Sequence, residues 1–334
     1  MKLRLEIKLA KILTVFVIGI FIMTVMASTG YNQEQKIDLK FKPDGTFKIV
    51  QFTDIQDGPD IDSRTINLMN RVLDYEKPDL VVLTGDITDE RSKTEADVKK
   101  AIGEVAQPME KRHIPWAVVF GNHDGRNNVM PKDAIMDVYM SYPCNISEKG
   151  PHNIDGVGNY NLLIKSSKGQ EPVFNIYMLD SGRTAAPPLT GYDWIKPNQI
   201  EWYREKSKTL KTTYGRSIPA LMFFHIPIPE FKQLWDSGKT VGQRNEAESS
   251  PKVDSGLFTA VLEMGDVKGI FVGHDHTNDY TGDLYGVELG YSRNTGYGTY
   301  GKAGLSRGAR VFLLNENKPE QFETWMRLAS DCNG

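Results

Sequence analysis

Short apolar runs alternate with amphipathic segments between residues 47 and 120. Phe47–Thr53, Leu80–Thr84 and Trp116–Phe120 are mostly apolar and short, so each predicts a buried strand. Ser63–Tyr75 and Thr94–Arg112 carry apolar residues three and four positions apart, which predicts helices, the first with Ser63 as its cap. This order of strand, helix, strand, helix, strand is typical of an α/β sheet.

The rest of the chain is less regular but continues the same mixture. Two helices are expected, one opened by Pro197 and running through Leu210, the other over Ser255–Met264. Further strands are expected at Tyr160–Ile164, Phe174–Leu179, Ala220–Phe224, Gly269–Val272, Val287–Tyr291 and Ala309–Leu314. No Pro/Ser-rich linker or internal repeat divides the roughly 300 residues after the N-terminal segment, which suffice for one large α/β domain or two small ones.

Polar residues that bind metals or transfer protons in other proteins follow five of these apolar runs. They are Asp54 and Gln56, Asp86 and Asp89, Asn122 with His123 and Asp124, His225, and His274 with His276. The carboxyl ends of strands are where open α/β sheets place their chemistry. An Asn amide oxygen can ligate a hard metal ion while a neighbouring His handles a proton.

The N-terminus has the pattern of an export leader. Four basic residues between Lys2 and Lys11 precede an uncharged apolar run, Ile12–Ala27. This run is slightly long for a signal-peptide core and slightly short for a membrane span of about 20 residues. Residues 1–27 are therefore read as a signal peptide, which the small residues around Ala27 favour, or as an N-terminal membrane anchor. In both cases we expect an extracytoplasmic protein, secreted or anchored at the outer face of the cell membrane.

Charge and cysteine content narrow the classes of partner and site. The formal charge is −3, and it falls to −6 without residues 1–27, which carry +3. A mildly acidic protein is a poor electrostatic match for a nucleic-acid backbone. Cys144 and Cys332 are the only thiols, and in an oxidising compartment they either pair or stay free. Neither has the spacing of a metal-binding knuckle.

Together the polar clusters resemble the motifs of the calcineurin-like metallophosphoesterase family. The series Asp54-x-Gln56, Gly85-Asp86-x-x-Asp89, Gly121-Asn122-His123-Asp124, His225 and Gly273-His274-x-His276 follows the order of that family. Gly296-Tyr297-Gly298 and Arg307-Gly308-Ala309-Arg310 resemble a small single-domain branch related to the purple acid phosphatases. The resemblance implies a four-layer α/β/β/α sandwich of two mixed sheets flanked by helices, over residues 46–330, after a polar spacer at residues 28–45.

The resemblance also implies a dinuclear metal centre. The implied ligands are Asp86 as the bridge, Asp54 and His276 on the first ion, and Asn122, His225 and His274 on the second. Two cations neutralise the repulsion between an anionic nucleophile and a phosphate ester, and they acidify a bound water. The implied nucleophile is a metal-bound hydroxide. His123 would stay off the metals and act as the general acid, oriented by Asp89.

Gln56 departs from the family pattern, in which the first motif reads Asp-x-His. A Gln carbonyl oxygen is a weaker and harder ligand than imidazole, so direct or water-mediated binding by Gln56 would favour Mn, Fe or Mg over Zn. The alternative is that Gln56 only hydrogen-bonds a water at an incomplete site. The expected cofactors are thus two divalent or trivalent ions drawn from Mn, Fe, Mg and Zn.

The function that follows is an exported, metal-dependent phosphoesterase acting on a phosphorylated small molecule or polymer. Weaker candidates for substrate contacts are Arg126, Arg293, Tyr297 and Tyr300. One alternative is a diesterase acting on lipid head groups, wall polymers or nucleic acid, because the motifs do not separate monoesters from diesters. Another is a non-catalytic envelope protein that binds a phosphorylated ligand, with Gln56 marking an incomplete metal site.

Overall fold

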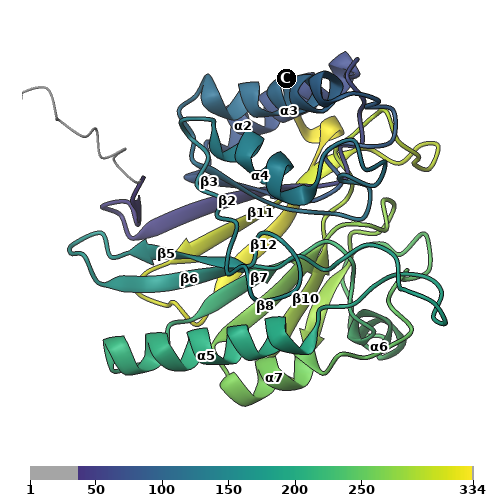
Figure 1. Cartoon of the computed structure of the whole chain (residues 1–334). Coiled ribbons are helices and arrows are strands. Elements are labelled where there is room, and N and C mark those ends of the chain that lie inside the picture. The colour runs from purple at the N-terminus through teal and green to yellow at the C-terminus, as the bar shows by residue number, and fades with distance from the viewer. Residues whose placement is uncertain (1–36, 333–334) are drawn as a thin grey trace, which may run out of the picture. The chain divides into compact units, whose positions relative to one another are not determined.

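Two β-sheets pack face to face in the computed structural model, which describes residues 37–332 (Figure 1). The predicted leader at residues 1–27 and the first half of the predicted spacer lie outside the described residues. Within residues 37–332, no helix is both long and apolar enough to cross a membrane.

The first sheet has five strands in the order β12–β11–β2–β3–β4. They are β2 (Thr46–Phe52), β3 (Leu80–Thr84), β4 (Trp116–Val119), β11 (Gly308–Asn315) and β12 (Phe322–Leu328). Strands β2, β3 and β4 run parallel, so their carboxyl ends meet at one edge, whereas β11 pairs antiparallel with both β2 and β12. Strands β3 and β4 are buried along their whole length, as expected for parallel strands covered on both faces.

The second sheet has seven strands in the order β1–β5–β6–β7–β8–β10–β9. They are β1 (Leu39–Lys40), β5 (Tyr160–Lys165), β6 (Pro172–Met178), β7 (Ala220–Phe223), β8 (Val267–Val272), β9 (Thr281–Leu284) and β10 (Val287–Tyr291). Strands β6, β7, β8 and β10 form a parallel centre, and β5 and β9 pair antiparallel at its two sides. The sheet is therefore mixed, as is the first.

Helices cover the outer face of each sheet (Figure 1). The five-stranded sheet is covered by α2 (Ser63–Glu76), α3 (Glu95–Glu110) and α4 (Lys132–Met140), and the seven-stranded sheet by α5 (Pro197–Tyr214), α6 (Glu230–Asp236) and α7 (Leu257–Met264). A 3₁₀ turn, η1 (Ala329–Cys332), follows β12. The arrangement confirms the predicted four-layer α/β/β/α fold.

Local capping chemistry fixes where the first two helices begin. The Thr94 hydroxyl accepts from the Asp97 amide (3.1 Å) and the Asp97 carboxylate accepts from the Thr94 amide (2.9 Å), which is a complete capping box. The cap of α2 is Asp62, whose carboxylate accepts from the Arg64 amide (2.9 Å), so the predicted cap at Ser63 is wrong by one residue. Asp62 is as good a cap as serine, and Ser63 becomes the first helical residue.

Aromatic side chains fill the space between the sheets. Phe271 of β8 lies with its ring centroid 4.5 Å from that of Phe312 on β11, in an edge-on arrangement. Phe223 and Phe322 pack on the same pair from β7 and β12. Such aromatic pairs add about 0.5–1.5 kcal/mol each beyond the area they bury. This interior fixes the relative position of the two sheets, and with it the position of the loops at their edge.

A buried polar side chain also joins the sheets close to that edge. The side-chain amide of Gln51, at the end of β2, donates to the Thr84 hydroxyl (2.8 Å) and to the Val272 carbonyl (3.2 Å). Thr84 and Val272 are the last residues of β3 and β8. Gln51 therefore ties together three strand ends that belong to different sheets.

The elements that the sequence analysis did not predict are short or lie at the edges of the sheets. They are α4, α6, β1, β9 and β12. Strand β12 is partly exposed along most of its length, which removes the apolar pattern of a buried strand. The compact unit begins at Asp38, and β1 pairs with β5 inside the segment predicted as a polar spacer.

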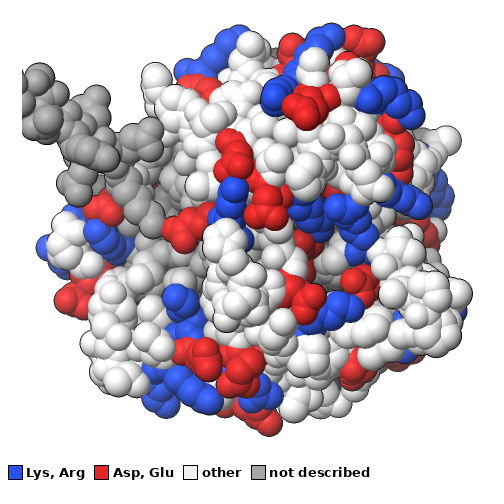
Figure 2. All heavy atoms as spheres, viewed as in Figure 1, with Lys and Arg blue, Asp and Glu red and all other residues white. Residues whose placement is uncertain are grey.

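Two further features bear on the predictions from composition. Cys144 is buried and Cys332 half-buried, and both are free thiols. On the face drawn in Figure 2, acidic and basic side chains are interspersed rather than gathered into areas of one sign.

Candidate metal centre

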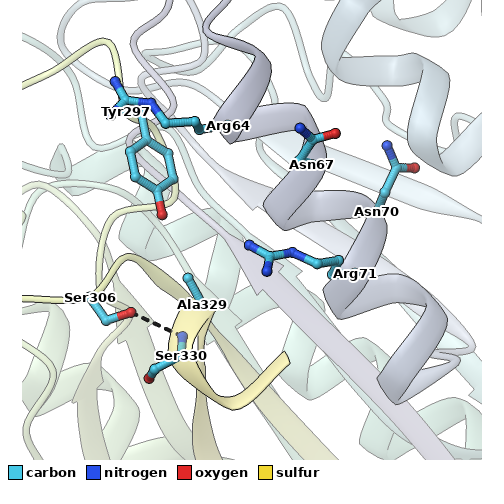
Figure 3. A pocket seen from close by; sticks show the side chains of 8 residues that line it. All are labelled: Arg64, Asn67, Asn70, Arg71, Tyr297, Ser306, Ala329 and Ser330. Atoms are coloured by element: carbon cyan, nitrogen blue, oxygen red, sulfur yellow. Dashed lines mark hydrogen bonds between the residues drawn. The ribbon is translucent and has the colours of Figure 1, made fainter. Parts of the chain in front are cut away.

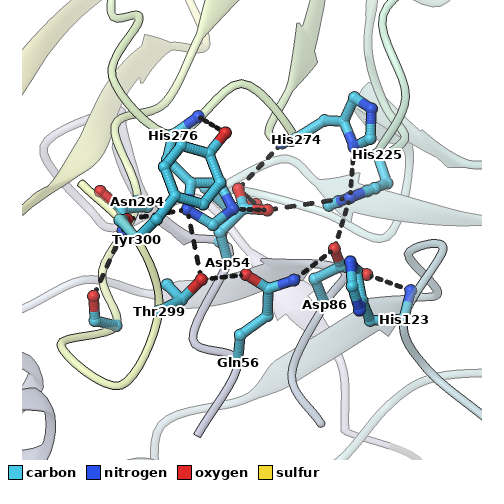
Figure 4. A network of polar contacts seen from close by, with 12 residues as sticks. Asp54, Gln56, Asp86, His123, His225, His274, His276, Asn294, Thr299 and Tyr300 are labelled. Atoms are coloured by element: carbon cyan, nitrogen blue, oxygen red, sulfur yellow. Dashed lines mark hydrogen bonds and ion pairs between the residues drawn. The ribbon is translucent and has the colours of Figure 1, made fainter. Parts of the chain in front are cut away.

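The predicted ligands come together where parallel strands of both sheets end (Figure 4). Asp54 and Asp86 follow β2 and β3 of one sheet, while His225, His274 and His276 follow β7 and β8 of the other. The sheets are joined there directly, because the His274 amide donates to Asp54 Oδ2 (2.9 Å). Four segments that are distant in sequence thus meet at one buried cluster.

The backbone at this cluster is held in an unusual conformation. Asp54, Gln56, Asp86 and His274 all have positive φ angles, of 50°, 40°, 52° and 77°. Non-glycine residues adopt this region at a cost of roughly 1–3 kcal/mol each, and they gather at functional sites. The turns aim these side chains back toward the edge of the sheets.

Two glycines are required because the loops approach so closely. A Cβ atom on Gly121 would lie 2.1 Å from Asp86 Oδ1, and one on Gly273 would lie 2.0 Å from the Thr53 hydroxyl. Both distances are far inside van der Waals contact. The glycines in the Gly-Asn-His-Asp and Gly-His-x-His motifs therefore serve the approach of the ligand loops.

The imidazoles face the carboxylates through their Nε2 atoms. His225 Nε2 lies 3.1 Å from Asp86 Oδ2, and His276 Nε2 lies 3.3 Å from Asp54 Oδ1. The opposite nitrogens donate to backbone carbonyls, His225 Nδ1 to Thr84 (2.8 Å) and His276 Nδ1 to Tyr300 (3.1 Å). A carbonyl can only accept, so these bonds fix the tautomer that leaves Nε2 available to a metal.

Buried polar atoms without hydrogen bonds also indicate that these residues fit a metal ion. Asn122 Oδ1 and His274 Nε2 are buried side-chain atoms that have no hydrogen-bond partner within residues 37–332, and Asp54 Oδ1 forms no hydrogen bond there although His276 Nε2 lies 3.3 Å away. Such orphaned atoms are rare in folded proteins, and a bound ion is one way to satisfy them. In addition, ligand atoms of Asp86, His225 and His274 all lie within 4.8 Å of one another.

Burial and neighbouring charges shift the pKa values of the histidines and aspartates in the cluster. Burial lowers the pKa of His225, but the Asp86 and Asp54 carboxylates outweigh it and raise that pKa to about 10. Burial and the adjacent His225 lower the pKa of His274 to about 3. Despite burial, the neighbouring histidines hold the carboxyl pKa values of Asp54 and Asp86 below their usual range. The metal-free cluster thus pairs a cationic His225 with two anionic carboxylates.

Gln56 lies inside the cluster but presents its amide nitrogen to it. Its Nε2 donates to Asp86 Oδ2 (3.2 Å), and its Oε1 accepts from the Thr299 hydroxyl (2.5 Å). An ionised carboxylate only accepts, so the amide must turn its N–H toward Asp86. In this arrangement Gln56 hydrogen-bonds Asp86 and Thr299, and both readings of its role toward a metal ion stay predictions.

His123 is held by Glu90 rather than by Asp89. His123 Nδ1 lies 3.0 Å from Glu90 Oε2, and the His123 amide donates to Asp86 Oδ1 (2.7 Å). Asp89 instead accepts from the amide (2.9 Å) and the Nε atom (2.8 Å) of Arg91. The predicted orientation of His123 by Asp89 is therefore wrong, because Asp89 is engaged in its own turn and the next residue reaches the imidazole.

Asp124 shapes the loop that carries the central carboxylate, a role that the sequence analysis missed. Its buried carboxylate accepts from the amides of Asp86 (2.8 Å), Ile87 (3.1 Å), Thr88 (3.0 Å) and Gly121 (2.9 Å). Its place beside His123 in the motif was the only sequence signal. Through these bonds Asp124 fixes the backbone of the loop that carries Asp86.

The four weaker candidates separate into different surroundings. Arg126 Nε lies 3.3 Å from Glu90 Oε1 and its side chain is half-exposed, which suits a substrate contact. Tyr300 stacks on His276, with ring centroids 3.9 Å apart. Arg293 is buried in an ion pair with Asp279, so its prediction as a substrate contact is wrong.

Tyr297 is the fourth of these candidates, and two residues that were not predicted also lie near the cluster. The Tyr297 ring lies over the Arg64 guanidinium and lines a separate pocket away from the predicted ligands. Two contacts at the site were not predicted from the sequence. Thr299 contacts Gln56, and Glu246 accepts from the Tyr300 hydroxyl (2.9 Å). Both lie in irregular loops without a recognisable motif.

Comparison with known proteins agrees with this geometry. Residues 47–278 match the family model for calcineurin-like phosphoesterases. The chain is 37% identical to "Probable inactive purple acid phosphatase 29" of Arabidopsis thaliana, over 88% of this chain and 85% of that protein. It is 32% identical to "Phosphatase DCR2" of Saccharomyces cerevisiae, over 92% of this chain and 57% of that protein. A solved dimetal phosphatase from Danio rerio shares the fold, with a TM-score of 0.53 at 14% identity, covering 84% of this chain and 98% of that one.

Proposed function

The chain belongs to the calcineurin-like phosphoesterase family, and we propose that it hydrolyses phosphate esters at the metal centre between its two sheets. The observation that carries this proposal is the set of orphaned ligand atoms on Asp54, Asn122 and His274. They surround a buried pairing of carboxylates and imidazoles, beside the candidate acid His123. Buried polar groups left without partners cost stability, so their retention together favours a bound ion.

Metal ions at this cluster would supply Lewis-acid stabilisation of phosphate oxygens and would acidify a water molecule. The residues that would hold them are Asp86 between both ions, Asp54 and His276 at one, and Asn122, His225 and His274 at the other. A mixed set of carboxylate, amide and imidazole ligands suits Mn, Fe, Mg or Zn. The carbonyl bonds of His225 and His276 orient both rings for this purpose.

His123 is the residue proposed to deliver a proton to the leaving-group oxygen. Glu90 accepts from Nδ1 of His123, which leaves Nε2 to exchange the proton with the substrate. The same carboxylate holds Arg126, whose guanidinium would meet the non-bridging oxygens of the phosphate. Glu90 thus positions one group for proton transfer and another for binding.

A non-catalytic phospholigand-binding protein is the second candidate, and Gln56 is the observation that favours it. Its amide hydrogens point at Asp86, where a ligand to the first ion would present a lone pair. Rotation of the amide by half a turn would present its oxygen instead, once an ion neutralises the carboxylate. One relative is named "Probable inactive purple acid phosphatase 29", and the word inactive there describes the relative. In this chain, a pure binder would have no use for the His123–Glu90 pair.

The proposed setting is outside the cytoplasm, with a phosphorylated small molecule or polymer as the substrate. The support for export is the sequence of residues 1–27, four basic residues followed by an uncharged apolar run. Recovery of the native protein from the cytoplasm with an intact N-terminus would overturn the proposal of export. The mildly acidic charge and the mixed charge in Figure 2 disfavour nucleic acid as the substrate.

The test is an assay of purified protein with p-nitrophenyl phosphate and with bis-p-nitrophenyl phosphate. The protein is stripped with a chelator and supplied separately with Mn, Fe, Mg or Zn. Metal-dependent turnover of either ester supports the enzyme, and the ratio of the two rates separates monoesterase from diesterase. Folded, metal-loaded protein that binds phosphate but turns over neither ester supports the binding protein instead.

A further inference from the structure

A tyrosine ring packs against each imidazole of the Gly-His-x-His motif. The Tyr192 ring meets that of His274 edge-on, with ring centroids 4.3 Å apart. The Tyr300 ring stacks on that of His276, with centroids 3.9 Å apart and planes 11° from parallel (Figure 4). Because His274 and His276 are the proposed ligands of different ions, an aromatic ring stands beside a proposed ligand of each ion.

Tyr192 belongs to a short hairpin at residues 182–193 that is fixed to the loops of the metal centre. Thr184 and Tyr192 pair in an antiparallel bridge across the hairpin. At its base, Arg183 Nη1 donates to the carbonyl of Gly125 (2.9 Å), the residue that directly follows the Gly-Asn-His-Asp motif. The hairpin thus holds the Tyr192 ring in a defined place, and that ring remains partly exposed.

Tyr300 comes from the loop at residues 296–300, which has two sides. Tyr297 lines a separate pocket beside α2 (Figure 3), whereas Tyr300 packs on His276. The Tyr300 hydroxyl donates to Glu246 Oε2 (2.9 Å), which prevents the ring from swinging away. Tyr300 is nevertheless 54% exposed. The imidazole covers one face of its ring, so the exposed area leaves the other face open to a ligand.

The charges around Tyr192 locate it beside the same site. Burial raises the pKa of the Tyr192 hydroxyl, several carboxylates add to this, Asp86 and Glu246 among them, and the Arg126 guanidinium opposes it. Tyr192 therefore lies near the central carboxylate, near the arginine proposed to meet the phosphate, and near the acid that holds Tyr300.

We infer that Tyr192 determines substrate specificity and, together with Tyr300, forms an aromatic entrance to the metal centre for phosphate esters of planar, aromatic or heteroaromatic groups. Aromatic groups pack on one another in offset or edge-on arrangements. Two rings that are already held in place offer this contact at a low cost in conformational entropy. The inference rests on the proposed function, because it concerns the organic part of the ester whose phosphate the metal centre would bind.

The experiment measures the binding of three phosphonates by calorimetry to the full-length protein loaded with Mn. Methylphosphonate, phenylphosphonate and cyclohexylphosphonate share the anionic group, and their C–P bond is not an ester that the protein would hydrolyse. Phenylphosphonate should bind about tenfold more tightly than methylphosphonate, because it contacts both rings. It should also bind about threefold more tightly than cyclohexylphosphonate, which is similar in size but not planar.

Variants of the two loops assign this preference to the rings. Tyr192→Ala should lower the ratio of phenylphosphonate to methylphosphonate affinity about threefold or more, without changing metal content or the affinity for methylphosphonate. Tyr192→Phe keeps the ring and should keep the ratio. Tyr300→Ala should lower the ratio independently, from the other loop. Thr190→Ala is the matched hairpin control, because that exposed hydroxyl accepts from Lys252 Nζ (2.7 Å) and not from a residue of the metal centre.

Three results would overturn the inference: equal affinities of the native chain for the three phosphonates, an unchanged ratio in Tyr192→Ala, or a ratio lowered as much by Tyr192→Phe or Thr190→Ala. Turnover of p-nitrophenyl phosphate, measured on the same preparations, separates this outcome from failure of the proposed function. Turnover by a native chain without aromatic preference would reject the inference and leave the enzyme standing. A preference that depends on Tyr192 in a chain without turnover would support the inference and reject the enzyme.

Discussion

Nδ1 of His123 lies 3.0 Å from Oε2 of Glu90, a carboxylate one residue beyond the acid that the motif suggested. The contact explains how an imidazole that is only partly buried keeps a defined orientation. It also makes His123 and Glu90 a pair whose members can be tested separately.

Replacement of His123 by Ala should leave metal content unchanged and lower turnover by roughly 10²-fold or more. The physical reason is that the side chain contacts Glu90 and not the metal ligands, so only proton transfer is lost. Metal analysis and steady-state kinetics on the same preparation check this. Loss of bound metal in the variant would mean that His123 is a ligand.

Glu90→Gln should lower turnover by impairing proton transfer from His123. The size of the loss should therefore depend on how much the leaving group of the substrate needs a proton. Phenyl phosphate, which needs a proton on its departing oxygen, should slow by about tenfold or more, while p-nitrophenyl phosphate should slow much less. Asp89→Asn is the matched control, because Asp89 contacts Arg91 and not His123. Equal effects of Glu90→Gln on both esters, or a larger effect of Asp89→Asn, would refute the assignment.

Gln56→His should tighten metal binding at the first site. An imidazole between Asp54 and Asp86 would offer a lone pair where Gln56 now offers amide hydrogens. Titration of stripped protein with Zn should show a second equivalent bound more strongly than in the native chain. An unchanged affinity would mean that the position does not face the metal.

Acidity should oppose metal binding through His225. Its pKa near 10 in the metal-free protein means that a metal ion must displace a proton, so apparent affinity should rise about tenfold per pH unit between pH 7 and 9. Metal titrations across that range check the slope. An affinity independent of pH would show that His225 is already neutral before metal binds.

The raised pKa of His225 also determines whether the metal-free protein gains or loses stability as the pH rises. The folded pKa of His225 is raised above the usual value of about 6.5, so its contribution to the free energy of unfolding is complete below pH 6.5 and declines toward pH 10. The decline should approach about 1.4 kcal/mol per pH unit for one proton. Urea unfolding at pH 7, 8 and 9 measures it, and stability that rises with pH would contradict the assignment.

Much of the site could be predicted because strand ends gather polar residues. Asp54, Asp86 and His225 each follow an apolar run, and buried parallel strands are the easiest elements to recognise. The fold class followed from the order of these runs and from the family that the motifs resemble.

The remaining contacts could not be predicted because they depend on loop geometry. Asp89 and Glu90 are adjacent acids, and only the turn made by Asp89 with Arg91 decides which of them reaches His123. Arg293 reads as a ligand-binding residue in a Gly-rich loop, yet it neutralises the nearby Asp279 in the interior. Side-chain partners in such loops leave no periodic signal.

The central claim is that the buried cluster of carboxylates and imidazoles is a catalytic metal centre. The most direct measurement is turnover of p-nitrophenyl phosphate against equivalents of metal added to stripped protein, beside His225→Ala as a control. Activity should be absent without metal, should rise with added equivalents, and should stay at background in the variant. Full activity after chelation, or folded protein that binds metal and shows no turnover with Mn, Fe, Mg or Zn, would contradict the claim.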